Sequence, residues 1–181
     1  MRHLIHISIL LFLISCTEKE NIHGNFLTNY SDYCGHAYEG ETTLADIGGG
    51  EAFEGVRLLM VLKECDEEMV RIPFYVGDDR SRTWIVQMKD GKLHLSHDHR
   101  YEDGTEHDNN FYGGFADEQG TVLKQFFPAD ERTIEDRPER SINTWSKEFD
   151  LAELTYYYRL YLNDELRFEA AFDLTNPLPV E

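Results

Sequence analysis

Two histidines, His97 and His99, are the residues whose type and spacing are best suited to chemistry. They stand two positions apart in a stretch that alternates like a β-strand, so their side chains are expected on one face, about 7 Å apart. Two imidazoles on one face can share a divalent metal ion. The following loop offers further ligands, namely Asp103, Glu106, His107 and Asp108. One hypothesis is therefore a metal-binding protein that uses His97, His99, Asp103 and His107.

A second hypothesis gives the same histidines a structural role. His97 would pack on Trp84, and His99 would hydrogen-bond a carboxylate near Arg82, so that both cap a packed core. No cysteine pair, HExxH helix or other recognised ligand spacing accompanies them. We therefore favour the structural role and expect no cofactor, with the divalent metal as the alternative.

Motifs of catalysis are missing elsewhere in the sequence. There is no GxSxG nucleophile elbow. Gly48-Gly49-Gly50 is not followed by Lys-Ser or Lys-Thr, so it is not a phosphate-binding loop. Carboxylates are too numerous for one pair to stand out as a glycosidase dyad. The sequence therefore predicts a protein that is not an enzyme.

The elements that must position these residues are short β-rich runs separated by turn residues. Gly113 and Gly114 interrupt one run, which is typical of a bulge or of a second backbone passing close by. No long amphipathic helix is present, so we predict an all-β fold, a single antiparallel up-and-down β-barrel of about ten strands, with a β-sandwich as the alternative. The expected strands are Tyr33–Glu41, Val56–Cys65, Met69–Val76, Arg82–Lys89, Lys92–His99, Asn110–Phe115, Thr121–Phe127, Asn143–Phe149, Leu154–Leu162 and Leu166–Leu174.

One hairpin is centred on Asp90-Gly91. Both residue types tolerate the positive φ of a type I′ turn, so a two-residue loop is predicted. A slip of one residue would move the apolar side chains to the other face. The resulting cross-strand pairs are Met88 with Leu93, Val86 with Leu95, Trp84 with His97, and Arg82 with His99.

The last hairpin is predicted to have a three-residue loop, Asn163–Glu165. A two-residue loop would place Arg159 opposite Phe168 on the apolar face, whereas three residues place it opposite Glu169 on the outer face. The apolar face then consists of Tyr156, Tyr158, Leu160 and Leu162 with Leu166, Phe168, Ala170 and Phe172.

The inward faces of these hairpins suggest a ligand site. Aromatic side chains with a few polar groups at one end are suited to a small amphipathic molecule. We therefore predict a non-enzymatic small-molecule-binding barrel, with a structural or protein-interaction role as a further alternative if the core is filled. The candidate ligand-binding residues are Arg82, Trp84, His97, His99, Tyr156 and Tyr158.

The N-terminus gives the expected location. Arg2 and a short apolar run end in Ser15-Cys16, which is the pattern of a secretory signal and resembles the lipobox of bacterial lipoproteins. The resemblance implies that Cys16 is lipidated and anchors the protein in the membrane of the bacterial cell envelope, most consistently the outer membrane. Three cysteines are present, so a lipid on Cys16 leaves Cys34 and Cys65 for a disulfide.

Composition completes the prediction of the organisation. The net charge of −18 repels phosphate backbones and excludes nucleic acid as a partner. We expect a signal peptide over residues 1–15, a lipidated cysteine and polar tether over 16–31, the barrel over 32–175 and a tail over 176–181. No sequence feature indicates a particular protein partner.

Several stretches together resemble a group of small uncharacterised secreted bacterial proteins. The resemblance covers most of the mature chain and implies no functional residues, because no activity is known for that group. The stretches are CGxxxEG (Cys34–Gly40), RIPFYVGDDRSRTW (Arg71–Trp84), HDHRYEDGT (His97–Thr105), YGG (Tyr112–Gly114), FPAD (Phe127–Asp130) and FDLT (Phe172–Thr175). The meandering strands are similar to those of lipocalin and fatty-acid-binding barrels, by analogy of fold alone.

Overall fold

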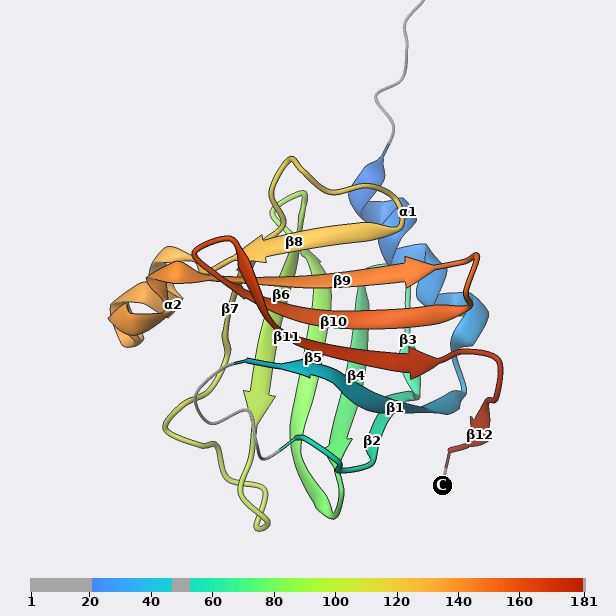
Figure 1. Ribbon diagram of the computed structural model, residues 1–181. Coiled ribbons are helices and arrows are strands. Elements are labelled where there is room, and N and C mark those ends of the chain that lie inside the picture. Colours follow the sequence, from blue (N-terminus) through green and yellow to red (C-terminus); the bar gives the residue numbers. More distant parts are fainter. Residues whose placement is uncertain (1–20, 47–52, 181) are drawn as a thin grey trace, which may run out of the picture.

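A computed structural model of the protein describes residues 21–46 and 53–180, and these form an antiparallel, nearly closed β-barrel (Figure 1). The strands follow one another around the barrel in the order β7-β6-β5-β4-β2-β1-β11-β10-β9-β8. The predicted all-β up-and-down barrel is therefore confirmed. The strands are β1 (His36–Ala45), β2 (Leu58–Leu62), β3 (Glu64–Cys65), β4 (Met69–Val76), β5 (Asp79–Lys89), β6 (Lys92–His99), β7 (Tyr112–Phe115), β8 (Lys124–Pro128), β9 (Asn143–Asp150), β10 (Thr155–Leu162), β11 (Glu165–Asp173) and β12 (Leu178–Pro179).

Short helices complete the fold. They are α1 (Ile22–Thr28), η1 (Asn29–Tyr33), α2 (Glu131–Asp136) and η3 (Pro138–Ile142). Each is too short to be stable alone and depends on packing against the barrel. No helix in residues 21–46 or 53–180 has the length and apolar character needed to cross a membrane.

The barrel closes where β7 meets the end of β8. The amide of Asp130 donates to the carbonyl of Gly113 (3.0 Å), and the Thr133 hydroxyl donates to the same carbonyl (2.9 Å). A Cβ atom on Gly113 would collide with the backbone of Leu95, and one on Gly114 would collide with the backbone of Pro128. The two glycines therefore allow the close backbone approach that the sequence suggested.

The first predicted hairpin has the expected register. Asp90 and Gly91 both have positive φ (52° and 75°), as a type I′ turn requires. Trp84 lies opposite His97, and Arg82 lies opposite His99, with the other predicted pairs also present. This hairpin places the two histidines and Trp84 on the inner face of the barrel.

The last hairpin corrects the prediction of its loop. The loop has two residues rather than three, because Asn163 and Asp164 both take positive φ (49° and 64°). A β-bulge at Arg167 then shifts the register, so that Arg159 still lies opposite Glu169. The two-residue turn leaves one extra residue in β11, and the bulge places this residue, Arg167, out of the pairing. The apolar face is therefore preserved.

The predicted tether is wrong over residues 22–31. Here α1 and η1 pack on the barrel, with Phe26 and Tyr30 completely buried. Asn21 caps α1 by accepting a hydrogen bond from the amide of Gly24 (3.0 Å). Asn29 donates to the carbonyl of Val122 (2.7 Å), which ties η1 to the loop before β8. The stretch looks polar because only three of its side chains are buried, namely Phe26 and Leu27 of α1 and Tyr30 of η1.

The predicted tail is also partly ordered, since β12 pairs with the start of β1 through His36 and Ala37. Before β1, Cys34 forms a disulfide with Cys65 of β3, with Cα atoms 6.2 Å apart. The predicted pairing of these two cysteines is confirmed. The bond joins η1 to the sheet. Cys16 and the signal segment lie outside the described residues.

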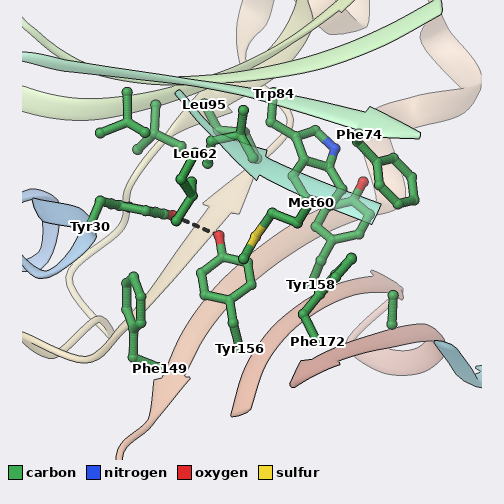
Figure 2. Packing of buried hydrophobic residues seen from close by; sticks show 14 of the residues in the cluster. Tyr30, Met60, Leu62, Phe74, Trp84, Leu95, Phe149, Tyr156, Tyr158 and Phe172 are labelled. Atoms are coloured by element: carbon green, nitrogen blue, oxygen red, sulfur yellow. Dashed lines mark hydrogen bonds between the residues drawn. The ribbon is translucent and has the colours of Figure 1, made fainter. Parts of the chain in front are cut away.

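Aromatic side chains dominate the core (Figure 2). Trp84 stacks on Phe74 (ring centroids 4.4 Å apart) and lies as close to Tyr158. At the end covered by α1 and η1, the Tyr30 and Tyr156 hydroxyls form a buried hydrogen bond of 2.6 Å. The core is therefore filled at that end, while the opposite end contains a cavity.

A candidate ligand-binding cavity

A cavity of about 170 Å³ opens at the barrel end away from α1. The ends of β4, β6 and β10 and the beginnings of β5 and β9 form its wall, together with β7, β11 and η3. The residues that line it are mostly aromatic, with a small polar group: Phe53, Phe74, Arg82, Thr83, Trp84, His97, His99, Tyr112, Arg140, Asn143, Trp145, Tyr158, Leu160 and Phe168.

Positive charge in the cavity contrasts with the acidic chain. Arg82 and Arg140 line it, and none of the described lining residues is a carboxylate. Arg82 is ion-paired with Asp79. Burial raises the pKa of the Asp79 carboxyl, but hydrogen bonds from Ser81 and Arg82 outweigh it and lower this pKa to about 2. Arg82 is thus largely neutralised, whereas Arg140 provides a positive charge that has no counter-ion among the described lining residues.

Arg140 lies over the ring of Tyr112, with its guanidinium carbon 3.6 Å from the ring centroid. Its Nη1 atom is buried and has no hydrogen-bond partner among the described residues. A buried guanidinium nitrogen without an acceptor is costly, and a ligand oxygen would remove that cost. The planar fork of arginine is suited to a carboxylate.

His97 is buried, and its tautomer follows from its partners. Nδ1 lies 3.1 Å from the carbonyl of Tyr112 and must donate, because a carbonyl only accepts. Nε2 then accepts from the hydroxyl of Tyr158 at 2.9 Å. Burial is the largest cause that lowers the pKa of His97 well below its ordinary value. His97 is therefore a neutral part of the cavity wall.

His99 also remains neutral near pH 7. Burial, followed by the positive charge of Arg82, lowers its pKa to about 4. Its Nε2 atom is 3.1 Å from the hydroxyl of Tyr112, whose ring stacks on His97. The two histidines thus share Tyr112 as a partner, and the predicted contacts with Trp84 and a carboxylate are replaced by this tyrosine.

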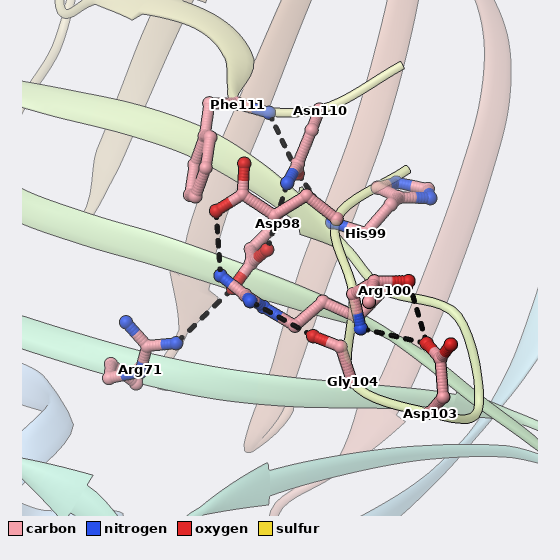
Figure 3. A network of polar contacts seen from close by, with 10 residues as sticks. Arg71, Asp98, His99, Arg100, Asp103, Gly104, Asn110 and Phe111 are labelled. Atoms are coloured by element: carbon pink, nitrogen blue, oxygen red, sulfur yellow. Dashed lines mark hydrogen bonds and ion pairs between the residues drawn. The ribbon is translucent and has the colours of Figure 1, made fainter. Parts of the chain in front are cut away.

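A network of polar contacts surrounds Asp98 on the outer face of β6, next to His99 (Figure 3). Asp98, between the two histidines, points outward and is buried under Arg71 and Arg100, with oxygen–nitrogen distances of 3.4 and 3.1 Å. Asn110 donates to Asp98 (3.3 Å) and accepts from the amide of His99 (2.7 Å). This network fixes the loop after β6 and hence the end of the strand.

The hypothetical metal ligands are engaged elsewhere. Both nitrogens of His97 have partners, and Asp103 accepts hydrogen bonds from Thr105 within its own turn. His107 stacks on Tyr101, with ring centroids 3.8 Å apart. In the part of the chain that the structure describes, no group of three His, Cys, Asp or Glu residues is arranged to hold a metal ion. The metal site stays a prediction without a supporting contact.

Most of the predicted ligand-binding residues lie together. Arg82, Trp84, His97, His99 and Tyr158 all line the cavity. Tyr156 does not: it points toward the α1 end and bonds to Tyr30. The residues that the sequence analysis missed include Tyr112, Arg140 and Trp145.

A sequence signal existed for only one of these missed residues. Trp145, Lys147 and Phe149 occupy every second position of a predicted strand. Their side chains are therefore expected on one face, and periodicity alone could have placed Trp145 inside the barrel. Arg140 sits in η3 after a proline, and only the closed barrel brings it over Tyr112.

Comparisons with known proteins do not place the chain in a family. No family model, curated protein or solved structure matches the chain significantly.

Proposed function

We propose that this protein is a lipid-anchored envelope protein whose barrel binds a small anionic ligand with a flat apolar body. The observation that carries the proposal is Arg140, a partly buried guanidinium with an unpaired Nη1 atom, in an aromatic cavity to which residues 21–46 and 53–180 contribute no carboxylate. The guanidinium would bind the anionic group of the ligand. The rings of Trp84, Trp145 and Tyr158 would cover its apolar body.

The size of the cavity limits the ligand. An apolar cavity of roughly 150 Å³ in another protein accommodates one benzene molecule, and the cavity here is about 170 Å³. A substituted aromatic or short branched carboxylate matches that volume, whereas a long fatty acid exceeds it. The ligand class is thus a compact carboxylate of about ten heavy atoms.

Two features favour binding over a purely structural role. The open end is hollow, although its aromatic residues are as large as those that fill the other end. His97 and His99 both have lowered pKa values, so neither adds positive charge to the cavity wall and Arg140 remains the group that attracts an anion. A packed structural barrel would need neither a cavity nor an unpaired guanidinium nitrogen.

Calorimetric titration with 4-methylbenzoate and its neutral amide tests the binding. We expect the carboxylate to bind at least tenfold more tightly than the amide, and Arg140→Ala to remove that preference. Arg132→Ala is the matched control, because Arg132 is exposed on α2 and should leave affinity unchanged. Equal binding of carboxylate and amide by the unaltered protein would reject the proposed anionic ligand.

The anchor is tested separately in a bacterial host. The proposal expects the mature chain to begin at a Cys16 that carries acyl groups and to fractionate with membranes. Cys16→Ala should move the protein to the soluble fraction. A mature chain without acyl mass, still bound to the membrane, would reject lipid anchoring and leave the cavity proposal standing.

A further inference from the structure

Lys147 is a buried lysine on β9 that the ligand-binding proposal does not use. It lies between the inward-facing Trp145 and Phe149, and its side chain has no exposed surface. Its Nζ atom is 3.4 Å from the ring centroid of Trp84 and 4.6 Å from that of Tyr158. Within the described residues this nitrogen has no hydrogen-bond partner.

The surroundings favour the neutral amine. An ammonium ion without a paired carboxylate loses its hydration in such a place, and ring faces replace only part of it. Burial accordingly lowers the pKa of Lys147 well below that of a free lysine. A desolvated neutral amine carries a free electron pair at physiological pH and is a good nucleophile.

The amine lies directly behind the cavity wall. Trp84 and Tyr158, the two rings closest to Nζ, also line the cavity. Trp145, the inward neighbour of Lys147 along β9, lines it as well. Lys147 is not itself a lining residue, so Trp84 and Tyr158 lie between its amine and the cavity, and a carbonyl group would reach Nζ when one of these rings turns aside.

We propose that Lys147 captures the carbonyl group of a small aldehyde or ketone carboxylate as an imine, with the carboxylate bound at Arg140. The inference rests on the proposed ligand cavity and narrows its ligand to a compact oxo acid. It assigns one role to each of two otherwise unexplained groups, the unpaired guanidinium nitrogen and the unpaired amine.

The chemistry is balanced without a further reactant. The nitrogen electron pair attacks the carbonyl carbon and forms a carbon–nitrogen bond. The carbonyl oxygen then leaves as water, taking both hydrogens of the amine, and a carbon–nitrogen double bond remains. No oxidation or reduction occurs, and water reverses the reaction, so the captured ligand can be released.

A purely structural lysine predicts a different pattern. Methionine has a side chain of similar length and would fill the same space without a polar atom to desolvate. If Lys147 only packs, it should react with carbonyl compounds more slowly than exposed lysines, because it is buried. If it is a capture residue, it should react faster than they do.

Reductive trapping tests the inference on the mature protein. The protein is incubated with 4-carboxybenzaldehyde and sodium cyanoborohydride, which converts an imine into a stable secondary amine, and the modified lysines are located by peptide mass spectrometry. We expect Lys147 to be labelled at least tenfold faster than the partly exposed Lys124, which is ion-paired with Glu148 on the neighbouring position of β9. Lys147→Met should remove the fast labelling, and Lys124→Met should leave it unchanged.

Two further measurements separate this inference from the ligand proposal. An excess of 4-methylbenzoate should slow labelling at Lys147 at least tenfold, and Arg140→Ala should slow it similarly, since both act at the carboxylate site. Labelling restricted to exposed lysines, with normal binding of 4-methylbenzoate, would overturn the imine inference alone. Absence of both fast labelling and carboxylate binding would overturn the cavity proposal as well.

Discussion

The two ends of the barrel are built from similar aromatic residues and yet differ in what they can do. At the covered end, α1 and η1 insert Phe26 and Tyr30 against Phe149 and Tyr156, with ring centroids 4.9 to 5.8 Å apart. The polar atoms there satisfy each other through the Tyr30–Tyr156 hydrogen bond. This end is a closed hydrophobic core.

At the open end, aromatic rings form walls around a space. Arg140 and the neutral histidines provide polar groups there, and a nitrogen of Arg140 lacks a partner within the described residues. In the described residues, the segment before β2 places one ring at this end, that of Phe53, which packs on Phe74 and Phe168 and lines the cavity. The difference teaches that the rings of α1 and η1 fill one end as core, whereas at the other end the described residues leave a cavity.

The largest expected effect is on the covered end. Phe26→Ala removes a completely buried ring from the interface between α1 and the barrel and should lower the free energy of unfolding by about 3–5 kcal/mol. Urea denaturation measures the loss. Asn25→Ala, at an exposed position of the same helix, is the control and should change stability little. If α1 only rests on the barrel, both variants would lose equally little.

Removal of the disulfide should weaken the same end. The Cys34–Cys65 bond closes a loop with a sequence separation of 31 residues, and its removal is expected to reduce the free energy of unfolding by about 3–4 kcal/mol. The double variant Cys34→Ser, Cys65→Ser tests this by urea denaturation. Affinity for 4-methylbenzoate at the open end should stay the same. A large loss of affinity would show that the two ends are coupled.

The pH dependence of stability sharpens the contrast between the ends through Lys147. Burial lowers the pKa of the Lys147 amine well below its ordinary value in the folded protein, whereas in the unfolded chain lysine is protonated up to about pH 10.4. The unfolded state therefore binds one more proton, and stability should rise with pH by up to about 1.4 kcal/mol per unit between pH 7 and 9. Denaturant titrations at several pH values measure this slope, which Lys147→Met should abolish.

Between pH 7 and 9, the other buried titratable groups contribute little to the pH dependence of stability. His97 and His99 have lowered pKa values, so they also make the protein more stable as pH rises, but only below about pH 7. Burial raises the pKa values of Tyr156 and Tyr158, so these act in the opposite direction above about pH 10. A slope that persists in Lys147→Met would mean that Lys147 is charged in the folded protein.

The smallest change in stability is expected at the open end. Phe53 is half-buried and packs on Phe168 with ring centroids 5.4 Å apart, so Phe53→Ala should cost about 1 kcal/mol or less. Affinity for 4-methylbenzoate should fall about three- to tenfold, because the ring lines the cavity. Phe26→Ala should show the reverse, a large loss of stability with unchanged affinity. Similar behaviour of the two variants would break the comparison.

Local sequence signals predicted much of the fold. The Asp90-Gly91 turn and the alternation on both sides were enough to place Trp84 opposite His97, since turn geometry and strand period depend only on neighbouring residues. The last hairpin shows the limit. Its outer pair, Arg159 with Glu169, was predicted correctly, but the bulge at Arg167 was not, because a tighter turn plus a bulge gives the same facing pattern.

Other errors came from contacts between distant segments. The stretch containing Phe26 and Tyr30 looks like a tether because its apolar residues are too few to show a helical period. It folds because the barrel end offers Phe149 and Tyr156 as partners. Tyr156 was wrongly assigned to the ligand site because strand periodicity shows that its side chain points into the barrel. Periodicity does not show which end of the barrel the side chain faces, and Tyr156 bonds to Tyr30 at the covered end.

The sequence by itself determined the class of fold, the disulfide partners and the inner face that carries Arg82, Trp84, His97 and His99, because these depend on short-range periodicity and on counting cysteines. Only the tertiary structure decided which end of the barrel contains the cavity and which further residues line it. Closure of the barrel at Gly113 and Gly114 brings β7 and η3 to the histidines. That closure sets Arg140 over Tyr112, and the inward face of β9 places Lys147 behind Trp84, through contacts between residues far apart in the chain.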